Sequence, residues 1–225
     1  MKRISYQLMA LAMILSTGST ALAADDESGT FDWDGLVPVE ESRVHAAYIN
    51  PEADFAVFQR VAILDPFVAF RSNWQRDQNR SRSRNIRASD LDRIKTDVAA
   101  LFKDVFTEEL ETAGYEVVNY SDEDVLILRP AILDLDVVAP DVRSSARNRT
   151  YTATTGSATL MLELFDALSG DLVGRAADRR TARNGGGFAT VSNRVTNRAE
   201  ARREFRVWAN KLVEFLDSHY VKVED

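Results

Sequence analysis

The sequence predicts an α+β domain, in which an antiparallel sheet of about five strands carries two amphipathic helices packed on one face. Segments of alternating apolar residues follow one another over residues 115–180, joined by short turns and without a helical pattern between them. One segment with helical spacing precedes these strands and another follows them, so two helices are available to cover the sheet. A doubly wound parallel sheet is the alternative, but it needs a helix between each pair of strands.

The N-terminus has the features of a secretory signal peptide. Lys2 and Arg3 supply positive charge, residues 8–15 (LMALAMIL) form a short apolar run, and residues 21–23 (ALA) form a small-residue cleavage site. The apolar run is too short for a membrane span, which needs about 20 residues. We therefore expect cleavage after Ala23 and a periplasmic or secreted mature protein.

Cleavage there divides the chain into three parts: a signal peptide over residues 1–23, a flexible acidic leader over residues 24–35 and a single α+β domain over residues 36–225. Cysteine is absent, so we expect no disulfide, no thiolate metal site and no lipid anchor on cysteine. Removing the two signal-peptide bases from 28 leaves 26 bases against 35 acids, a net charge of −9. This acidic balance argues against nucleic-acid binding. No later segment has the length and hydropathy of a transmembrane helix.

The domain begins with an irregular segment and one strand. Residues 36–57 lack a clear period and are punctuated by Pro38 and Pro51. Residues 60–70 (RVAILDPFVAF) predict the first strand, and the Asp65-Pro66 pair within it predicts a bulge or a sheet edge.

A helix of about 24 residues follows. Ser89 is its expected N-cap, Asp90 and Asp92 complement the helix dipole, and Gly114 is its expected C′ residue. Spacings of three and four residues define one apolar stripe: Leu91, Ile94, Val98, Leu101, Phe102 and Val105.

Four strands are predicted next, over residues 115–120, 124–138, 150–165 and 172–180. The last two form a hairpin whose turn carries Gly170. Alternation in the third places four residues on the buried face: Ala158, Leu160, Leu162 and Leu164.

The last element is a helix over residues 196–218. Its apolar stripe consists of Ala201, Phe205, Trp208, Leu212, Phe215 and Leu216. Because Trp208 lies in the middle of this stripe, we expect the helix to be required for stability.

Catalytic chemistry has few candidates. His45 and His219 lie in peripheral segments, so neither a nucleophile–histidine–carboxylate triad nor a histidine metal site is expected. Asp134 and Asp136, with Asp141 shortly after them, would be the ligands of a hard cation or the acid and base of a hydrolase. The competing interpretation is the solvent face of a half-buried strand. The apolar residues that alternate with the pair are expected to share the opposite face: Leu133, Leu135 and Val137. We expect no cofactor and no metal.

The most unusual feature is the arginine-rich segment, residues 71–87 (RSNWQRDQNRSRSRNIR). It has a net charge of +5 in an acidic chain and reads as a polar loop without periodicity. Its six arginines are Arg71, Arg76, Arg80, Arg82, Arg84 and Arg87. Arginine recognises phosphates and carboxylates, and Trp74 offers a ring for stacking. The sequence therefore predicts a site for an anionic envelope component or an acidic envelope protein. A solvated connecting loop remains the alternative.

Three segments resemble the bacterial exported family known as domain of unknown function 3313: residues 48–63 (YINPEADFAVFQRVAI), 127–141 (ILRPAILDLDVVAPD) and 163–180 (ELFDALSGDLVGRAADRR). A closing helix around Trp208 also fits. Many members look like lipoproteins, so the missing cysteine implies free periplasmic residence for this chain. The resemblance implies no catalytic residues.

These observations favour a non-catalytic binding or accessory module of the cell envelope. A carboxylate-dependent hydrolase that uses the aspartate cluster is one alternative, and a structural subunit of an envelope assembly is another.

Overall fold

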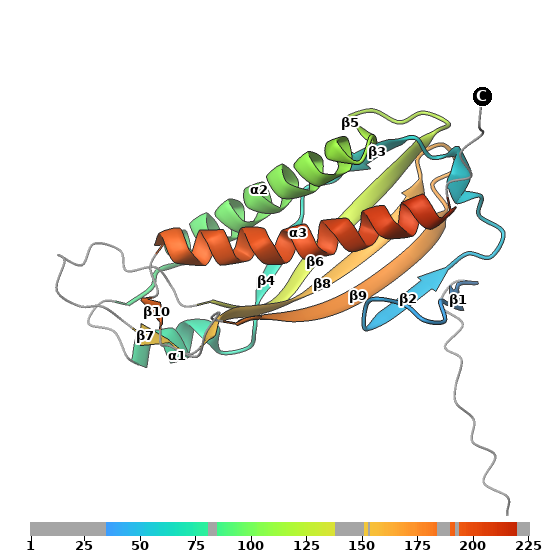
Figure 1. The fold of residues 1–225 in the computed structure, drawn as a ribbon. Coiled ribbons are helices and arrows are strands. Elements are labelled where there is room, and N and C mark those ends of the chain that lie inside the picture. The colour runs from blue at the N-terminus through green and yellow to red at the C-terminus, as the bar shows by residue number, and fades with distance from the viewer. Residues whose placement is uncertain are drawn as a thin grey trace, which may run out of the picture. The chain divides into compact units, whose positions relative to one another are not determined.

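Most of the predicted domain is described by the computed structural model, which covers residues 35–80, 85–137, 151–152, 154–183, 190–191 and 194–219. The predicted signal peptide and nearly all of the acidic leader lie outside these residues. Within them the chain forms an eight-stranded mixed sheet, with two long helices side by side across one of its faces (Figure 1).

The strands of the large sheet are β1 (Val37–Pro38), β2 (Ala46–Ile49), β3 (Arg60–Ile63), β4 (Phe67–Phe70), β5 (Glu116–Val118), β6 (Val125–Val137), β8 (Thr154–Asp166) and β9 (Leu172–Arg183). Their order is β1-β2-β9-β8-β6-β3-β5, and β4 also pairs with β6. β7 (Tyr151–Thr152) and β10 (Thr190–Val191) form a separate pair. The helices are η1 (Phe55–Val57), α1 (Trp74–Arg80), α2 (Ala88–Thr112) and α3 (Arg194–His219).

The prediction of an antiparallel sheet of about five strands is wrong. The pairs β6–β8, β8–β9, β9–β2 and β2–β1 are antiparallel, but β3 is parallel to both β5 and β6, and β4 is parallel to β6. The parallel half arises because α2 carries the chain back along the sheet before β5 and β6 begin, as a crossover helix does. Two extra strands at one side of the sheet, β1 and β2, come from residues 36–57, which the sequence predicted as irregular.

The single strand predicted over residues 60–70 is present as two shorter strands. Its two halves, β3 and β4, pair with successive parts of β6, and the Asp65-Pro66 pair lies in the break between them. Proline has no N–H for a ladder, so an interruption is the arrangement that a sheet tolerates there.

The first long helix begins two residues earlier than predicted. Its N-cap is Arg87 rather than Ser89, and the Asp90 carboxylate accepts a hydrogen bond of 3.0 Å from the Arg87 backbone N–H. Its C-terminus is as predicted, because Gly114 has a φ of +98°. Backbone N–H groups of Gly114 and Tyr115 close the helix in a Schellman motif.

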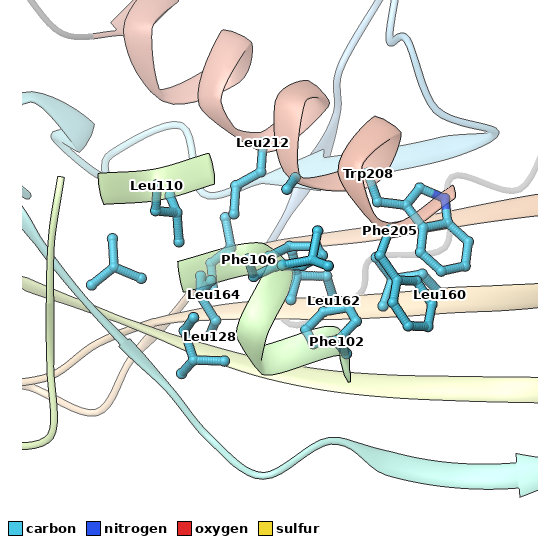
Figure 2. Packing of buried hydrophobic residues seen from close by; sticks show 14 of the residues in the cluster. Phe102, Phe106, Leu110, Leu128, Leu160, Leu162, Leu164, Phe205, Trp208 and Leu212 are labelled. Carbon is cyan, nitrogen blue, oxygen red and sulfur yellow. The ribbon is translucent and has the colours of Figure 1, made fainter. Parts of the chain in front are cut away.

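The core lies between the sheet and the two long helices (Figure 2). Phe102 and Phe106 of α2 stack with ring centroids 3.9 Å apart, and Phe205 of α3 meets Phe102 edge to face at 5.5 Å. The predicted leucines of β8 form the opposing surface and are buried: Leu160, Leu162 and Leu164. Figure 2 shows these leucines among the side chains of both helices, as two helices packed on one face of a sheet require.

A β-bulge in β6 changes which residues face the core. Leu133 pairs with Thr159 whereas Asp136 pairs with Ser157, so β6 contains one extra residue there, and Asp134 adopts a φ of +50°. Leu135 is buried, but Leu133 lies before the bulge and is only half-buried. The expectation that Leu133 and Leu135 share a face is therefore wrong, because the extra residue between them reverses the alternation.

Candidate functional site

A cavity of about 280 Å³ lies where the N-terminal edge of the sheet meets α3. Residues 39–45, which we call the strap, run from β1 to β2 along this edge. β2 pairs with β9, so the strap is held beside the outer part of the sheet. Side chains from the strap, β2, β8, β9 and α3 line the cavity.

Most of the cavity surface is apolar. Leu160, Leu162 and Leu164 of β8 contribute from the sheet, and Leu212 and Phe215 contribute from α3. Further apolar lining residues are Val39, Val44, Ala47, Ile49, Ala176 and Trp208. A cavity with this lining favours an apolar group over water, because water there would find few hydrogen-bond partners.

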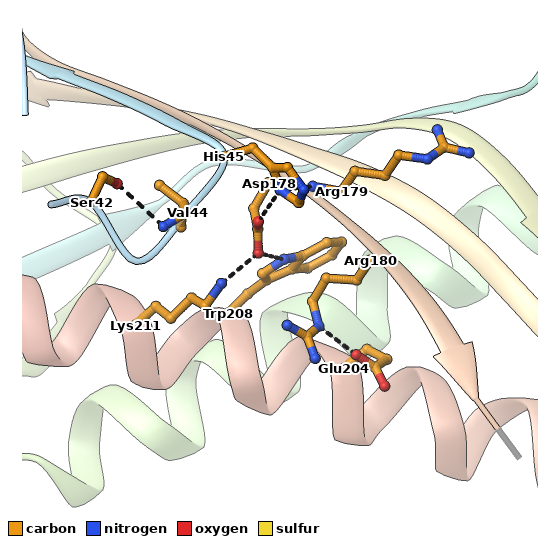
Figure 3. A network of polar contacts seen from close by, with 9 residues as sticks. All are labelled: Ser42, Val44, His45, Asp178, Arg179, Arg180, Glu204, Trp208 and Lys211. Carbon is orange, nitrogen blue, oxygen red and sulfur yellow. Dashed lines mark hydrogen bonds and ion pairs between the residues drawn. The ribbon is translucent and has the colours of Figure 1, made fainter. Parts of the chain in front are cut away.

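One side of the cavity carries a buried carboxylate, Asp178 of β9, which is 4% exposed (Figure 3). Its Oδ2 accepts hydrogen bonds from Trp208 Nε1 at 3.0 Å and from Lys211 Nζ at 2.7 Å. Its Oδ1 lies 2.5 Å from Nδ1 of His45, at the end of the strap. The Asp178 carboxylate is therefore contacted by side chains from both the strap and α3, and it connects these two elements to the sheet.

The network keeps Asp178 ionised. Burial alone raises the pKa of this carboxyl, but hydrogen bonds from Lys211 and His45 and the charge of Lys211 outweigh burial, so the pKa lies below its ordinary value. His45 Nδ1 is also 3.2 Å from the backbone N–H of Arg179. One nitrogen cannot donate to a carboxylate and accept from an amide at once, so the shorter contact indicates that Nδ1 carries the proton.

A second contact ties the strap to α3. Arg43 of the strap pairs with Glu214 of α3, and both side chains are more than half exposed. Within the strap, Ser42 Oγ accepts a hydrogen bond of 3.2 Å from the Val44 N–H, and Glu41 has a φ of +58°. The strap is therefore a turn whose C-terminal half is held to β9 and α3 by the polar contacts of His45 and Arg43.

The structure places Trp74 of the arginine-rich segment in the interior. Its side chain is 1% exposed, stacks on Phe70 with centroids 4.2 Å apart, and donates a hydrogen bond of 2.9 Å to the Val137 carbonyl. Residues 74–80 form α1 rather than an extended loop. Trp74 anchors the segment in a small core with Ile86 and Ile94, so its ring is not presented to a ligand.

Arg71 is also engaged within the domain. Its guanidinium lies 2.7 Å from Asp77 and 2.7 Å from Asp136. The hydrogen bond from Arg71 holds the pKa of Asp77 below its ordinary value, and the two carboxylates raise the pKa of Arg71. This pairing links the start of the arginine-rich segment to β6.

Three other arginines of the segment are described. The side chains of Arg76 and Arg80 are 62% and 72% exposed, with Asp77 at 3.9 and 3.8 Å. Arg87 is the N-cap of α2. The structure therefore separates the segment into an anchored base and an exposed pair. Arg82 and Arg84 lie outside the described residues.

The two described members of the aspartate cluster do not converge on one point. Asp136 pairs with Arg71, whereas Asp134 lies 4.0 Å from Arg179, and Asp141 lies outside the described residues. Among the side chains that the structure describes, no group of three histidine, aspartate or glutamate residues is arranged to hold a metal.

Sequence reasoning missed the cavity. It treated residues 36–57 as irregular and His45 as peripheral, although His45 contacts Asp178 across 133 positions of sequence. The available signal was Asp178 itself, a charged residue on the same face of β9 as Ala176, beside the leucines of β8. Nothing in the spacing identified Lys211 and Trp208 as its partners.

No helix in the described part of the chain has both the length and the apolar character needed to span a membrane. No curated protein matches the sequence. Among solved structures, the fold is similar to a PelC dodecamer from Paraburkholderia phytofirmans, with 12% identity over 69% of this chain and 89% of that one and a TM-score of 0.38.

Two further similarities are to protein XCC0632 from Xanthomonas campestris, which carries the family label DUF330, and to a minor lipoprotein from Acinetobacter baumannii. The first has 10% identity over 82% of this chain and 94% of that one, with a TM-score of 0.44. The second has 10% identity over 72% and 94%, with a TM-score of 0.33. Similarity at this level does not bear on function.

The family of this chain is identified by its sequence rather than by these structural similarities. The family model described as protein of unknown function DUF3313 matches residues 26–212, which include every strand of the sheet and most of α3. The match extends over much more than half of the chain, and the chain therefore belongs to the DUF3313 family.

Proposed function

We propose that this protein is a non-catalytic binding module of the cell envelope, and that it holds a small apolar or amphiphilic molecule in the cavity beside the strap. The observation that carries this proposal is the cavity itself, with aliphatic and aromatic walls around one buried and compensated carboxylate. Binding pockets typically combine apolar walls with a few placed polar groups.

The size of the cavity supports a small ligand. Its volume of about 280 Å³ is near the lower end of the range of roughly 300–1,000 Å³ for ligand pockets. An apolar cavity of about 150 Å³ is enough to bind benzene. A ligand of suitable size is therefore a molecule with a single short acyl chain or a compact ring system.

The proposed compartment rests on the N-terminal sequence. Lys2, Arg3, the apolar run at residues 8–15 and the small residues at 21–23 support export and cleavage after Ala23. An exported binding module of this kind meets amphiphiles released from the envelope.

A pair of neighbouring alanines provides the test of the cavity. Ala176 lines the cavity, whereas Ala177 follows it in β9 and points to the other face of the sheet. Ala176→Leu should fill the cavity and remove binding of decanol, measured by calorimetry and by the rise in melting temperature. Ala177→Leu is the matched control and should bind like the wild type. Equal decanol binding by both variants, or none by the wild type, would contradict the proposal.

The arginine-rich segment supports a second candidate, contact with an anionic envelope component. Arg76 and Arg80 are exposed on a short helix whose base is fixed by buried Trp74, so their charges are presented without ordering a flexible loop. Capture on anionic lipid vesicles or lipopolysaccharide at low salt tests this candidate. The Arg76→Ser/Arg80→Ser variant should lose capture while its stability stays within about 0.5 kcal/mol of the wild type. Capture that persists in the variant would remove this candidate.

A further inference from the structure

The charged side chains of the cavity are already paired. Its two cationic side chains, Lys211 and Arg43, each pair with a carboxylate that also lines the cavity. Arg175 borders the cavity as well, but strand alternation places its side chain on the other face of the sheet, where its guanidinium binds Glu163. The local charge is therefore balanced with the histidines neutral, and what distinguishes one head group from another is hydrogen bonding.

The hydrogen-bonding capacity of the cavity, however, is one-sided. Asp178 Oδ2 already accepts from Trp208 and Lys211, and its Oδ1 is occupied by His45. A cationic head group would have to displace one of these donors to reach this carboxylate. The other carboxylate, Glu214, is exposed and already paired with Arg43.

Hydrogen-bond donors, in contrast, remain available to a ligand in the cavity. The Lys211 ammonium carries three N–H groups, and among the described residues it makes one hydrogen bond, to Asp178. The Lys211 side chain is only 20% exposed, so its remaining N–H groups meet little water. Donors in such a setting bind an acceptor more strongly than donors in open solvent do. The exposed guanidinium of Arg43 provides further donors at the cavity rim.

We propose that the ligand of this cavity is a single-chain amphiphile with an anionic head group. Its chain lies against Leu162 and Leu212, and its head accepts hydrogen bonds from Lys211. This inference rests on the proposed binding function and adds the chemical class of the ligand. A carboxylate and a phosphate monoester share the required chemistry, namely several acceptor oxygens and a negative charge.

Three probes with the same ten-carbon chain separate the head group from the chain: decanoate, decanol and decyltrimethylammonium. Each is titrated into the mature protein below its critical micelle concentration, with heat of binding as the readout. We expect decanoate to bind about tenfold more tightly than decanol, a ratio that corresponds to about 1.4 kcal/mol. Decyltrimethylammonium should bind most weakly, and added salt should weaken the binding of decanoate alone. Decyl phosphate, compared with decanoate, distinguishes the two anionic classes.

Substitutions test whether the preference for decanoate over decanol depends on side chains of the cavity. Lys211→Met should abolish the preference for decanoate and keep decanol binding, whereas Lys103→Met, which alters an exposed lysine paired with Asp65, should change neither. If Lys211→Met does not fold, Arg43→Gln removes an exposed rim charge at little cost in stability and should reduce the preference.

The possible failures are distinguishable. If none of the three probes binds to the wild type, the proposed binding function fails together with this inference. If decanol binds but decanoate binds no more tightly, or if the cationic probe binds best, the cavity is a binding site and the anionic head group is refuted. A preference for decanoate that survives in both Lys211→Met and Arg43→Gln also overturns the assignment.

Discussion

Asp178 is the residue whose chemistry most directly connects folding to the cavity. Replacing it with asparagine keeps the shape but removes the charge that Lys211 and His45 surround. Breaking one partner of a buried ion pair is strongly destabilising, so we expect Asp178→Asn to lower the free energy of unfolding by about 3 kcal/mol at neutral pH. Urea unfolding at constant slope is the measurement.

The same residue predicts a pH dependence. The pKa of Asp178 is lower in the folded protein than its ordinary value of 3.8, so its stabilisation is fully present above that value and is lost as the pH falls through the folded pKa. The difference in unfolding free energy between the wild type and Asp178→Asn should therefore shrink below about pH 4. A difference that stays constant from pH 7 to pH 3 would show that the carboxylate charge is unimportant.

Trp74 provides a test of the anchored arginine-rich segment. Trp74→Phe keeps a ring against Phe70 but removes the hydrogen bond to the Val137 carbonyl. We expect a loss of about 1–2 kcal/mol in the free energy of unfolding, because the part-buried Val137 carbonyl loses its donor. Arg76→Ser in the same segment is the control and should stay within about 0.5 kcal/mol. Equal effects of the two substitutions would contradict the anchoring role.

At the scale of elements, α3 belongs to both the core and the cavity. Trp208 is 3% exposed, stacks with Phe205 and donates to Asp178. Trp208→Ala should lower the free energy of unfolding by about 3–5 kcal/mol, the usual range for removing a buried tryptophan, as denaturant unfolding would measure. Trp208→Phe retains most of the side-chain volume but loses the N–H donor. It should therefore lower the free energy of unfolding measurably, but by less than Trp208→Ala does. A loss below about 1 kcal/mol in Trp208→Ala would mean that α3 packs through a different face.

Elements with a strong internal period were predictable from the sequence. The stripes of α2 and α3, the leucines of β8, the turn at Gly170 and the helix end at Gly114 all depend on neighbours within a few positions. The parallel pairs of β3 and β4 with β6 were not predictable in this way, because pairing direction depends on the path of α2. For the same reason β1 and β2 were missed: strands of two and four residues contain too few positions to show alternation.

The candidate site was predictable only in part. Arg76 and Arg80 are exposed, as a charged segment should be, but a tryptophan among arginines gives no local sign of whether its ring is buried. The cavity is harder still. Its walls come from positions 39–49, 160–164, 175–178 and 208–219, and only the tertiary structure brings these together.

At the scale of the whole molecule, the predicted cleavage of the signal peptide gives the mature protein a defined mass. Because Ala23 ends a small-residue site after a short apolar run, protein recovered from a periplasmic fraction should begin at Ala24. Intact-mass spectrometry checks this. A substituted Ala21→Asp/Ala23→Asp precursor should retain residues 1–23 and serves as the control. Recovery of the wild type with these residues intact, or from the cytoplasm alone, would refute the prediction.

The pairing of β2 with β9 determines at which stage of folding the cavity forms. Ala46 pairs with Ala177, 131 positions later, and the wall of α3 follows still further along the chain. Closing so long a loop costs entropy before its contacts repay it, so this corner of the domain has a high contact order and should complete late in folding. Neither a nascent chain nor one truncated before α3 can form this cavity. Occupancy of the proposed site would therefore report on the finished fold, and by mass action a ligand bound there would stabilise the native state alone.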